Sequence, residues 1–319
     1  MPCSSTRPFT ALLAMVLMTV GVPVWAEPFG YSVNSRGVER DDRRVNALWQ
    51  INLANGEAEY IGWTTFLDVE ALALSPDGIL YGADDDTNTI VTISTTSGFA
   101  QPVGGAGNRS NTGLAPLNRT LDFGMTFTCH GDLFVVSDLE QSLFRADLET
   151  GRLELEGAPG SLDAPITDLA VRGHEVFGIG VGLTASGDTA APNLYRVNLE
   201  AATAELIGPL GEEAAPYNNA GLSFDENGVL WAITDRRGVG GEDLPSQILR
   251  IDPSSGAATL QSESIIGLES LAAAPPALCD RAALMHPAYP IPVLSRAGLA
   301  VLILALLLFA TLRLRFQNS

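Results

Sequence analysis

The chain has 319 residues, 46% of them apolar and only 17% charged, with 32 Gly and 19 Pro, which excludes disorder over most of its length. All its basic residues are Arg, and residues 27–290 hold 14 of them against all 37 acids, a net charge of −23. A surface this acidic repels phosphate backbones, so we expect no nucleic acid among the partners.

Residues 1–26 have the pattern of a secretory signal peptide. Arg7 precedes an apolar run over residues 11–20, and small residues end the segment at Ala26, ahead of Glu27. This order predicts cleavage between Ala26 and Glu27 and export of the remaining chain. An uncleaved membrane anchor is the alternative, and the shortness of the apolar run disfavours it.

A nine-residue phrase occurs five times between residues 27 and 275. Each copy is an apolar strand followed by a turn rich in Asn, Asp, Ser and Thr, usually ending in Gly, and a second strand follows, as in a β-hairpin. The copies begin 42, 53, 51 and 54 residues apart, at residues 48–56, 90–98, 143–151, 194–202 and 248–256.

A further hairpin precedes each copy from the second onward, so each unit has four strands. The second strand of this hairpin carries an aromatic residue at a fixed register, and these residues are Tyr81, Phe134, Phe177 and Trp231. The region begins with a single strand, 30–33, which has Tyr31 at that register, and ends with another single strand, 269–273. Joined together, the two single strands complete the unit around residues 48–56.

This pattern predicts an all-β domain over residues 27–275, a five-bladed β-propeller whose four-stranded antiparallel blades are closed by the N- and C-terminal strands. Closure is favoured because an open array would leave sheet edges unpaired. A β-sandwich or an open β-solenoid is the alternative fold. A degenerate blade within residues 104–119 is the alternative to a count of five.

The long connectors of the repeat are expected on one face of the disc. Each joins a second strand to a third, or a fourth strand to the next unit, and they span residues 34–46, 104–120, 180–193, 208–218 and 235–247. In an antiparallel blade these two kinds of connector emerge on the same side, where a rigid scaffold presents binding loops. Neutral growth of surface loops is the alternative.

Acids and amides recur near the start of each innermost strand, on the long-loop side. They are Glu70, Asp122, Asp168, Asn219 and Glu269. A ring of such oxygens around a channel predicts a site for a hard cation such as Ca²⁺. The five do not share one register, so we do not expect all of them to point inward. Solvated rim acids and strand caps are the alternative interpretation.

A second group of oxygens, on Asp84, Asp86 and Asn88, has the spacing of a calcium loop. The segment lacks the Gly and the final Glu of an EF-hand, so a solvated turn is the competing prediction. The sequence contains neither a Gly-x-Ser-x-Gly nor a His-Glu-x-x-His motif, and no nucleophile–base pair is recognisable.

The cysteines allow one disulfide. Cys3 is removed with the signal peptide, so the exported chain keeps Cys129 and Cys279. In an oxidising compartment these two are expected to pair and to join the segment after the last strand to the disc, two free thiols being the alternative.

The C-terminus reads as a membrane-directed signal after a Pro-rich linker, residues 276–290. The run over residues 298–312 is uncharged and predicts a transmembrane helix that is slightly shorter than a bilayer core, and Arg313 and Arg315 follow it. By the positive-inside rule the tail starts in the cytoplasm and the preceding chain lies outside.

Residues 291–319 resemble the IPTL-CTERM sorting signal of Gram-negative bacteria. The chain departs from its pattern at Val293, usually Thr, and at Ala297, usually Trp. The residues that match are Ile291, Pro292, Leu294, Ser295 and Gly298. The resemblance implies an exosortase-type transpeptidase as partner, cleavage near the motif, and delivery from the inner membrane to the envelope or cell surface.

Two functions are compatible with the sequence. The first is a non-catalytic surface propeller that binds a protein, a glycan or a cation through its long-loop face. The second is a Ca²⁺-dependent propeller hydrolase, such as a lactonase or esterase, that uses channel acids such as Glu70 and Glu269. The absence of a recognisable nucleophile–base pair favours the first.

Overall fold

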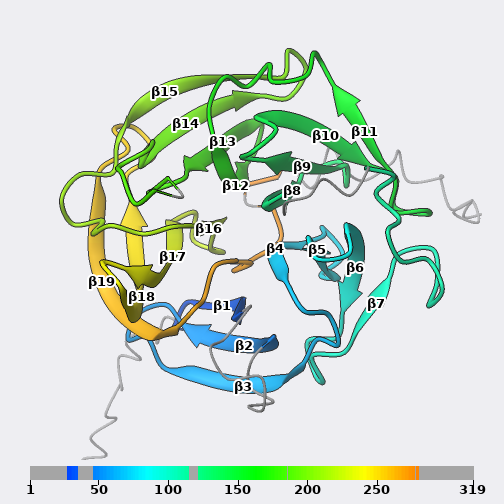
Figure 1. Ribbon diagram of the computed structural model, residues 1–319, viewed down its shortest axis with the longest axis horizontal. Coiled ribbons are helices and arrows are strands. Elements are labelled where there is room, and N and C mark those ends of the chain that lie inside the picture. The colour runs from blue at the N-terminus through cyan, green and yellow to red at the C-terminus, as the bar shows by residue number, and fades with distance from the viewer. Residues whose placement is uncertain (1–26, 35–45, 115–120, 185, 277, 280–319) are drawn as a thin grey trace, which may run out of the picture.

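The computed structural model describes residues 27–34, 46–114, 121–184, 186–276 and 278–279. The strands form five antiparallel sheets that stand around a common centre, each with its first strand innermost (Figure 1). The predicted all-β fold, a five-bladed β-propeller, is confirmed.

We number the blades I to V in chain order. Blade I contains β1 (Phe29–Asn34), β2 (Ala47–Asn52) and β3 (Ala58–Trp63), and blade II contains β4 (Val69–Leu74), β5 (Leu80–Asp84), β6 (Thr89–Ile93) and β7 (Ala100–Pro102). Blade III contains β8 (Phe123–Phe127), β9 (Leu133–Ser137), β10 (Ser142–Ala146) and β11 (Leu153–Glu156). Blade IV contains β12 (Ile166–Arg172), β13 (Glu175–Gly180), β14 (Asn193–Asn198) and β15 (Thr203–Pro209), and blade V contains β16 (Ala220–Phe224), β17 (Leu230–Val239), β18 (Glu242–Ile251) and β19 (Ala258–Ile266).

The C-terminal segment supplies the missing inner strand of blade I. The amide of Tyr31 donates to the carbonyl of Ala272 at 2.9 Å, and the amide of Ala272 donates back to Tyr31 at 2.9 Å. A second bridge joins Asn34 to Leu268. The two ends of the repeat therefore lie in one sheet, and the ring closes as predicted.

The residue that ends each nine-residue phrase holds neighbouring blades together. It has a positive φ in all five copies, for example +73° at Gly98 and +83° at Gly256. A Cβ on Gly98 would overlap the backbone of Gly62 in the preceding blade, and a Cβ on Gly56 would overlap Glu263, across the closure of the ring. Glycine therefore recurs here for two reasons, a left-handed backbone and a close interblade approach.

The aromatic residues of the repeat fill the spaces between blades. Tyr81 of blade II packs edge-on against Phe127 of blade III, with ring centroids 5.0 Å apart. Phe177 of blade IV packs in the same way on Phe224 of blade V, at 5.6 Å. Edge-to-face pairs of this kind stabilise a core beyond their apolar burial, so the recurring aromatic register reflects packing.

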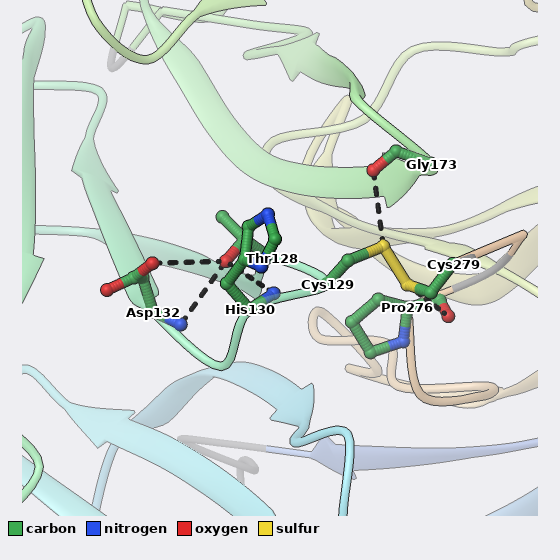
Figure 2. The surroundings of a disulfide bond; sticks show 7 residues. All are labelled: Thr128, Cys129, His130, Asp132, Gly173, Pro276 and Cys279. Atoms are coloured by element: carbon green, nitrogen blue, oxygen red, sulfur yellow. Dashed lines mark hydrogen bonds between the residues drawn. A yellow bond between two sulfur atoms is a disulfide. The ribbon is translucent and has the colours of Figure 1, made fainter. Parts of the chain in front are cut away.

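The centre of the ring is almost completely filled. The inner strands leave an internal space of about 20 Å³, room for no more than a water molecule, and Pro275 and Pro276 close it on the side of the short turns. Cys279 follows this segment and forms a disulfide with Cys129, at the end of β8 (Figure 2). This is the pairing that the sequence favours, and it ties the C-terminal segment to blade III.

Two expected connectors differ in detail. Residues 235–247 are not a loop, because β17 and β18 continue as a long hairpin around Gly240 and Gly241, whose positive φ values allow the tight turn. In the described part of the second long connector, residues 104–114 form successive turns and no strand, so this part contains no degenerate blade.

The predicted terminal signals lie outside the described residues. These are the signal peptide through Ala26, the sorting motif with Val293 and Ser295, and the transmembrane helix over residues 298–312. Within the described part of the chain, no helix has the length and apolar character needed to cross a membrane.

Candidate functional site

A cavity of about 550 Å³ opens at the long-loop mouth of the ring. Connectors of both expected kinds line it, and its walls come from all five blades. Its polar lining consists of Glu70, Asp122, Asp138, Gln141, Thr184, Asn218, Asn219, Asp235, Arg237 and Glu269. Four of the predicted site residues, Glu70, Asp122, Asn219 and Glu269, are therefore brought to one cavity.

The acids at this mouth occupy recurring positions in the blades. The residue before the inner strand accepts a hydrogen bond from an amide of the second strand or of the residue that follows it, as in Asp68–Asp85 at 3.0 Å and Asn219–Asp235 at 2.8 Å. Blade III has Asp122 and Asp138 at these positions. Each of these three blades thus contributes one polar pair to the rim.

Glu70 reaches the mouth through a β-bulge. Val69 pairs with Asp84 and Ala71 pairs with Ala83, so Glu70 is the extra residue in β4. The register of the closing strand shifts in the same way between Leu268 and Ala272. Bulges redirect a side chain, and here one of them lies directly beside the acidic rim.

Asp68, Glu70 and Asp85 form the tightest group of acids among the described residues. All three side chains are buried, and one carboxylate oxygen of each lies within 4.8 Å of the other two. Glu70 is 9% exposed, and its Oε2 accepts no hydrogen bond from any residue that the structure describes.

The electrostatic surroundings disfavour the charged form of Glu70. Burial raises the pKa of its carboxyl well above the usual range, and Asp122, Glu269, Asp85 and Asp68 raise it further through repulsion, in that order. Burial and repulsion therefore both favour the neutral form of Glu70, and a proton or a bound cation would relieve the repulsion.

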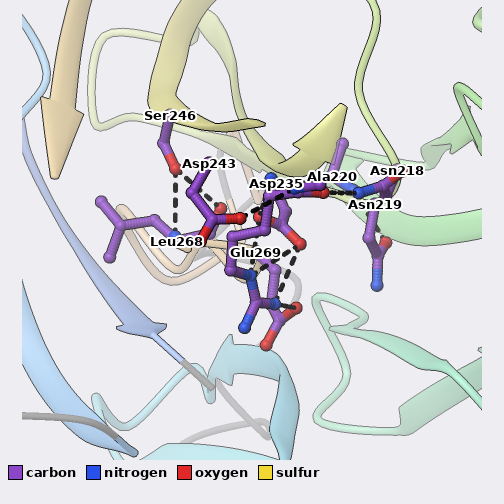
Figure 3. Close-up of polar contacts among 10 residues, drawn as sticks. Asn218, Asn219, Ala220, Asp235, Asp243, Ser246, Leu268 and Glu269 are labelled. Atoms are coloured by element: carbon purple, nitrogen blue, oxygen red, sulfur yellow. Dashed lines mark hydrogen bonds and ion pairs between the residues drawn. The ribbon is translucent and has the colours of Figure 1, made fainter. Parts of the chain in front are cut away.

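Arg237 neutralises the neighbouring part of the rim. Its Nη2 lies 2.9 Å from Asp235 Oδ2 and 2.8 Å from Glu269 Oε2, where β17 meets the closing strand (Figure 3). Burial alone would lower the pKa of Arg237, but Glu269 and Asp235 outweigh burial and raise it. The guanidinium therefore stays charged and fixes both carboxylates.

Asp168, the fifth residue of the predicted ring, lies inside the ring and not at the cavity. The bulged residue of β12 is Thr167, which corresponds to Glu70 in β4. Asp168 therefore lies one residue further along its strand than the position of Glu70. Its carboxylate accepts hydrogen bonds from the amides of Met125 at 2.9 Å and Leu222 at 2.6 Å. Burial raises the pKa of Asp168 although these donors oppose the shift. Asp168 thus links three inner strands.

The segment predicted as a calcium loop, residues 84–88, is a turn whose first carboxylate is hydrogen-bonded to nearby backbone amides. Asp84 accepts hydrogen bonds from the amides of Thr87 and Asp68, both at 2.9 Å, and burial raises its pKa against these bonds. Asp86 is exposed and Asn88 is buried. The residue of this segment that joins the acidic cluster is Asp85, which the spacing argument passed over.

Sequence reasoning also missed Asp68 and Arg237. Asp68 precedes its inner strand as Asp122 precedes the next, and this equivalence is visible once the units are aligned. Asp235 and Arg237 are two residues apart, a spacing that places side chains on one side of a strand. That signal was lost because the segment was expected to be a loop.

No protein-family model and no curated protein matches the sequence. Among solved structures, the chain is similar to a catalytically inactive virginiamycin B lyase from Staphylococcus aureus with quinupristin, at 16% identity over 73% of this chain and 70% of that chain, with a TM-score of 0.39. It is also similar to a protein of unknown function from Bacteroides caccae, at 13% identity, 77% and 98% coverage and a TM-score of 0.45. A nidogen/laminin complex matches at 10% identity, 71% and 76% coverage and a TM-score of 0.42. Similarity at this level concerns the fold alone.

Proposed function

We propose that the protein is a non-catalytic binding propeller that takes a hydroxyl-rich ligand, a glycan of the cell envelope, into the cavity at its long-loop mouth. The polar lining of this cavity is the observation that carries the proposal. Amide, carboxylate and guanidinium groups supply the adjacent donors and acceptors that neighbouring hydroxyl groups require. Leu139, Val181 and Leu183 add apolar surface for the carbon skeleton.

We further propose that the signals at the two ends direct export, with the exosortase-type enzyme as a partner and the cell surface as destination. The disulfide supports this orientation, because Cys279 is held on the short-turn face, opposite the cavity. A tether after Cys279 therefore leaves the binding mouth facing outward. Mass spectrometry of surface-released protein should find a C-terminus near Ser295, and an intact Phe316 would contradict sorting.

A glycan array tests the ligand class. The purified protein should bind a defined set of envelope glycans, and Gln141→Ala should weaken that binding about tenfold through the loss of a lining amide. His174→Ala, which alters the cavity on the opposite face, is the matched control and should bind normally. Absence of binding, or equal losses in both variants, would contradict the proposal.

A hydrolase is the second candidate, and the raised pKa of Glu70 favours it because a general acid must be protonated at its working pH. Chromogenic esters and lactones test this directly. A hydrolase should lose about 10²–10⁴ of its rate in Glu70→Gln. If the wild type and Glu70→Gln hydrolyse these substrates at the same background rate, a catalytic role for Glu70 is excluded.

A further inference from the structure

We propose that Asp68, Glu70 and Asp85 form a Ca²⁺ site beside the cavity, which Glu70 lines. This inference deepens the proposed function, on which it rests for the role of the cavity, and it names a cation as part of the ligand-binding site. Two of these three residues were not among the candidates that the sequence indicated.

The oxygen geometry fits one hard cation. Oxygens that share a Ca²⁺ ion at 2.3–2.6 Å lie within about 5 Å of one another, and the three carboxylates each place an oxygen within 4.8 Å of the others. The arrangement is fixed by the backbone, because the Asp85 amide donates to the Asp68 carbonyl at 3.0 Å and Glu70 occupies a bulge. The cluster is thus built into the junction of β4 and β5.

Glu70 provides an independent indication of a ligand. Its side chain is about nine-tenths buried, its Oε2 lacks a hydrogen-bond partner among the described residues, and it belongs both to the cluster and to the cavity lining. A buried carboxylate oxygen without a donor is costly, and the cost is removed by a bound cation or by protonation. These two solutions make different predictions.

The surrounding charge favours the cation. Asp122 and Glu269 add to the repulsion that the cluster exerts on Glu70, and Arg237, which also attracts Glu70, forms its ion pairs with Asp235 and Glu269. A divalent ion offsets several of these charges together, whereas one proton offsets a single charge. An exported protein also meets Ca²⁺ at concentrations that suit extracellular sites with Kd values of about 10⁻⁴–10⁻³ M.

Three carboxylates leave part of the coordination shell of Ca²⁺ for other oxygens, since the ion takes about six to eight. Glu70 opens onto the cavity, so water or the hydroxyl groups of a bound glycan would occupy these positions. Glycan binding at this site is then expected to require Ca²⁺.

Calorimetry and thermal unfolding with CaCl₂ alone test the metal site on the exported protein. The wild type, stripped with a chelator, should bind one Ca²⁺ per chain, and its Tm should rise by about 5 °C at a hundredfold excess over Kd. Glu70→Gln resembles the protonated carboxyl in shape and charge, so it should fold and lose both responses. Glu226→Gln, an exposed acid in the β16–β17 turn, makes the same charge change and should keep both.

The outcomes separate the two solutions. Equal Tm values for the wild type in CaCl₂ and in chelator, with no heat of binding, would overturn the proposal and assign a shared proton to Glu70. An equal response to MgCl₂ would overturn the choice of Ca²⁺. The glycan array is independent of these measurements: failure there with intact Ca²⁺ binding removes the proposed function and leaves the metal site.

Discussion

Two buried carboxylates at opposite mouths of the ring have opposite environments. At the short-turn mouth, Asp225 is 5% exposed and accepts hydrogen bonds from the amides of Asn227 and Val229 and from the indole of Trp231, at 2.8–2.9 Å. At the long-loop mouth, Glu70 is similarly buried but faces other acids, and its Oε2 has no donor among the described residues. Burial is common to both carboxylates, and the supply of hydrogen-bond donors and the nearness of other acids differ.

Other polar groups at each mouth show the same difference in their supply of hydrogen-bond partners. On the short-turn side, Ser75 and Thr128 occupy the position of Asp225 and also accept hydrogen bonds from the amides of their own turns. The disulfide lies next to the Thr128 turn (Figure 2), and Pro275 and Pro276 close the central space. On the other side, Asp235 and Glu269 share the guanidinium of Arg237 (Figure 3), whereas Glu70 Oε2 has no hydrogen-bond donor among the described residues. Polar groups that bond one another within their own turns contribute to stability, whereas a buried carboxylate oxygen without a donor among the described residues is suited to a ligand.

The largest expected effect is at Asp168, the buried acid with the greatest structural role. Asp168→Ala leaves the amides of Met125 and Leu222 without their acceptor inside the ring, so the free energy of unfolding should fall by about 3–5 kcal/mol. Urea unfolding measures this loss. A loss below about 1 kcal/mol would show that Asp168 is not a structural link.

Removal of the disulfide should have the next largest effect. Replacing Cys129 and Cys279 with Ser frees the segment that carries the closing strand, and the expected cost is about 2–4 kcal/mol. Unfolding with and without reductant should agree for the double variant and differ for the wild type. Equal stability of both proteins under oxidising conditions would contradict a role of the disulfide in closing the ring.

Asp225→Asn tests the satisfied carboxylate directly. The substitution keeps one acceptor oxygen but places an NH₂ group against the indole of Trp231 or against the turn amides, so a loss of about 1–2 kcal/mol is expected. In chelator, Glu70→Gln should not destabilise the protein, because it removes repulsion and no hydrogen bond to Oε2. Equal losses at the two positions would remove the distinction between the mouths.

The smallest effect is a dependence of stability on pH. The pKa of Glu70 is raised above its ordinary value of 4.5, so the folded protein binds more protons than the unfolded chain between these two pKa values. In chelator, the stability of the wild type relative to Glu70→Gln should therefore fall as pH rises above about 4.5. A difference that stays constant with pH, measured by urea unfolding, would show that Glu70 titrates normally.

The fold was predictable from the sequence because the repeat is a consequence of packing. The phrase-ending glycines and the aromatic register recur since each blade contacts the next in the same way, and β1, which pairs with β2 on one side, pairs on its inner side with the segment around Ala272. The site was predictable only in part. Which acid enters the cavity depends on its place relative to a bulge of one residue: Glu70 is the bulged residue of β4, whereas Asp168 follows the bulged residue of β12. Residue spacing contains no clear signal for a bulge.

A crystal structure of the protein grown with CaCl₂ tests the contrast between the two mouths most directly. We predict one Ca²⁺ ion at about 2.3–2.6 Å from carboxylate oxygens of Asp68, Glu70 and Asp85, and no ion beside Asp225. A structure in which Glu70 instead shares a proton with a neighbouring carboxyl, with no ion between the three acids, would contradict the account.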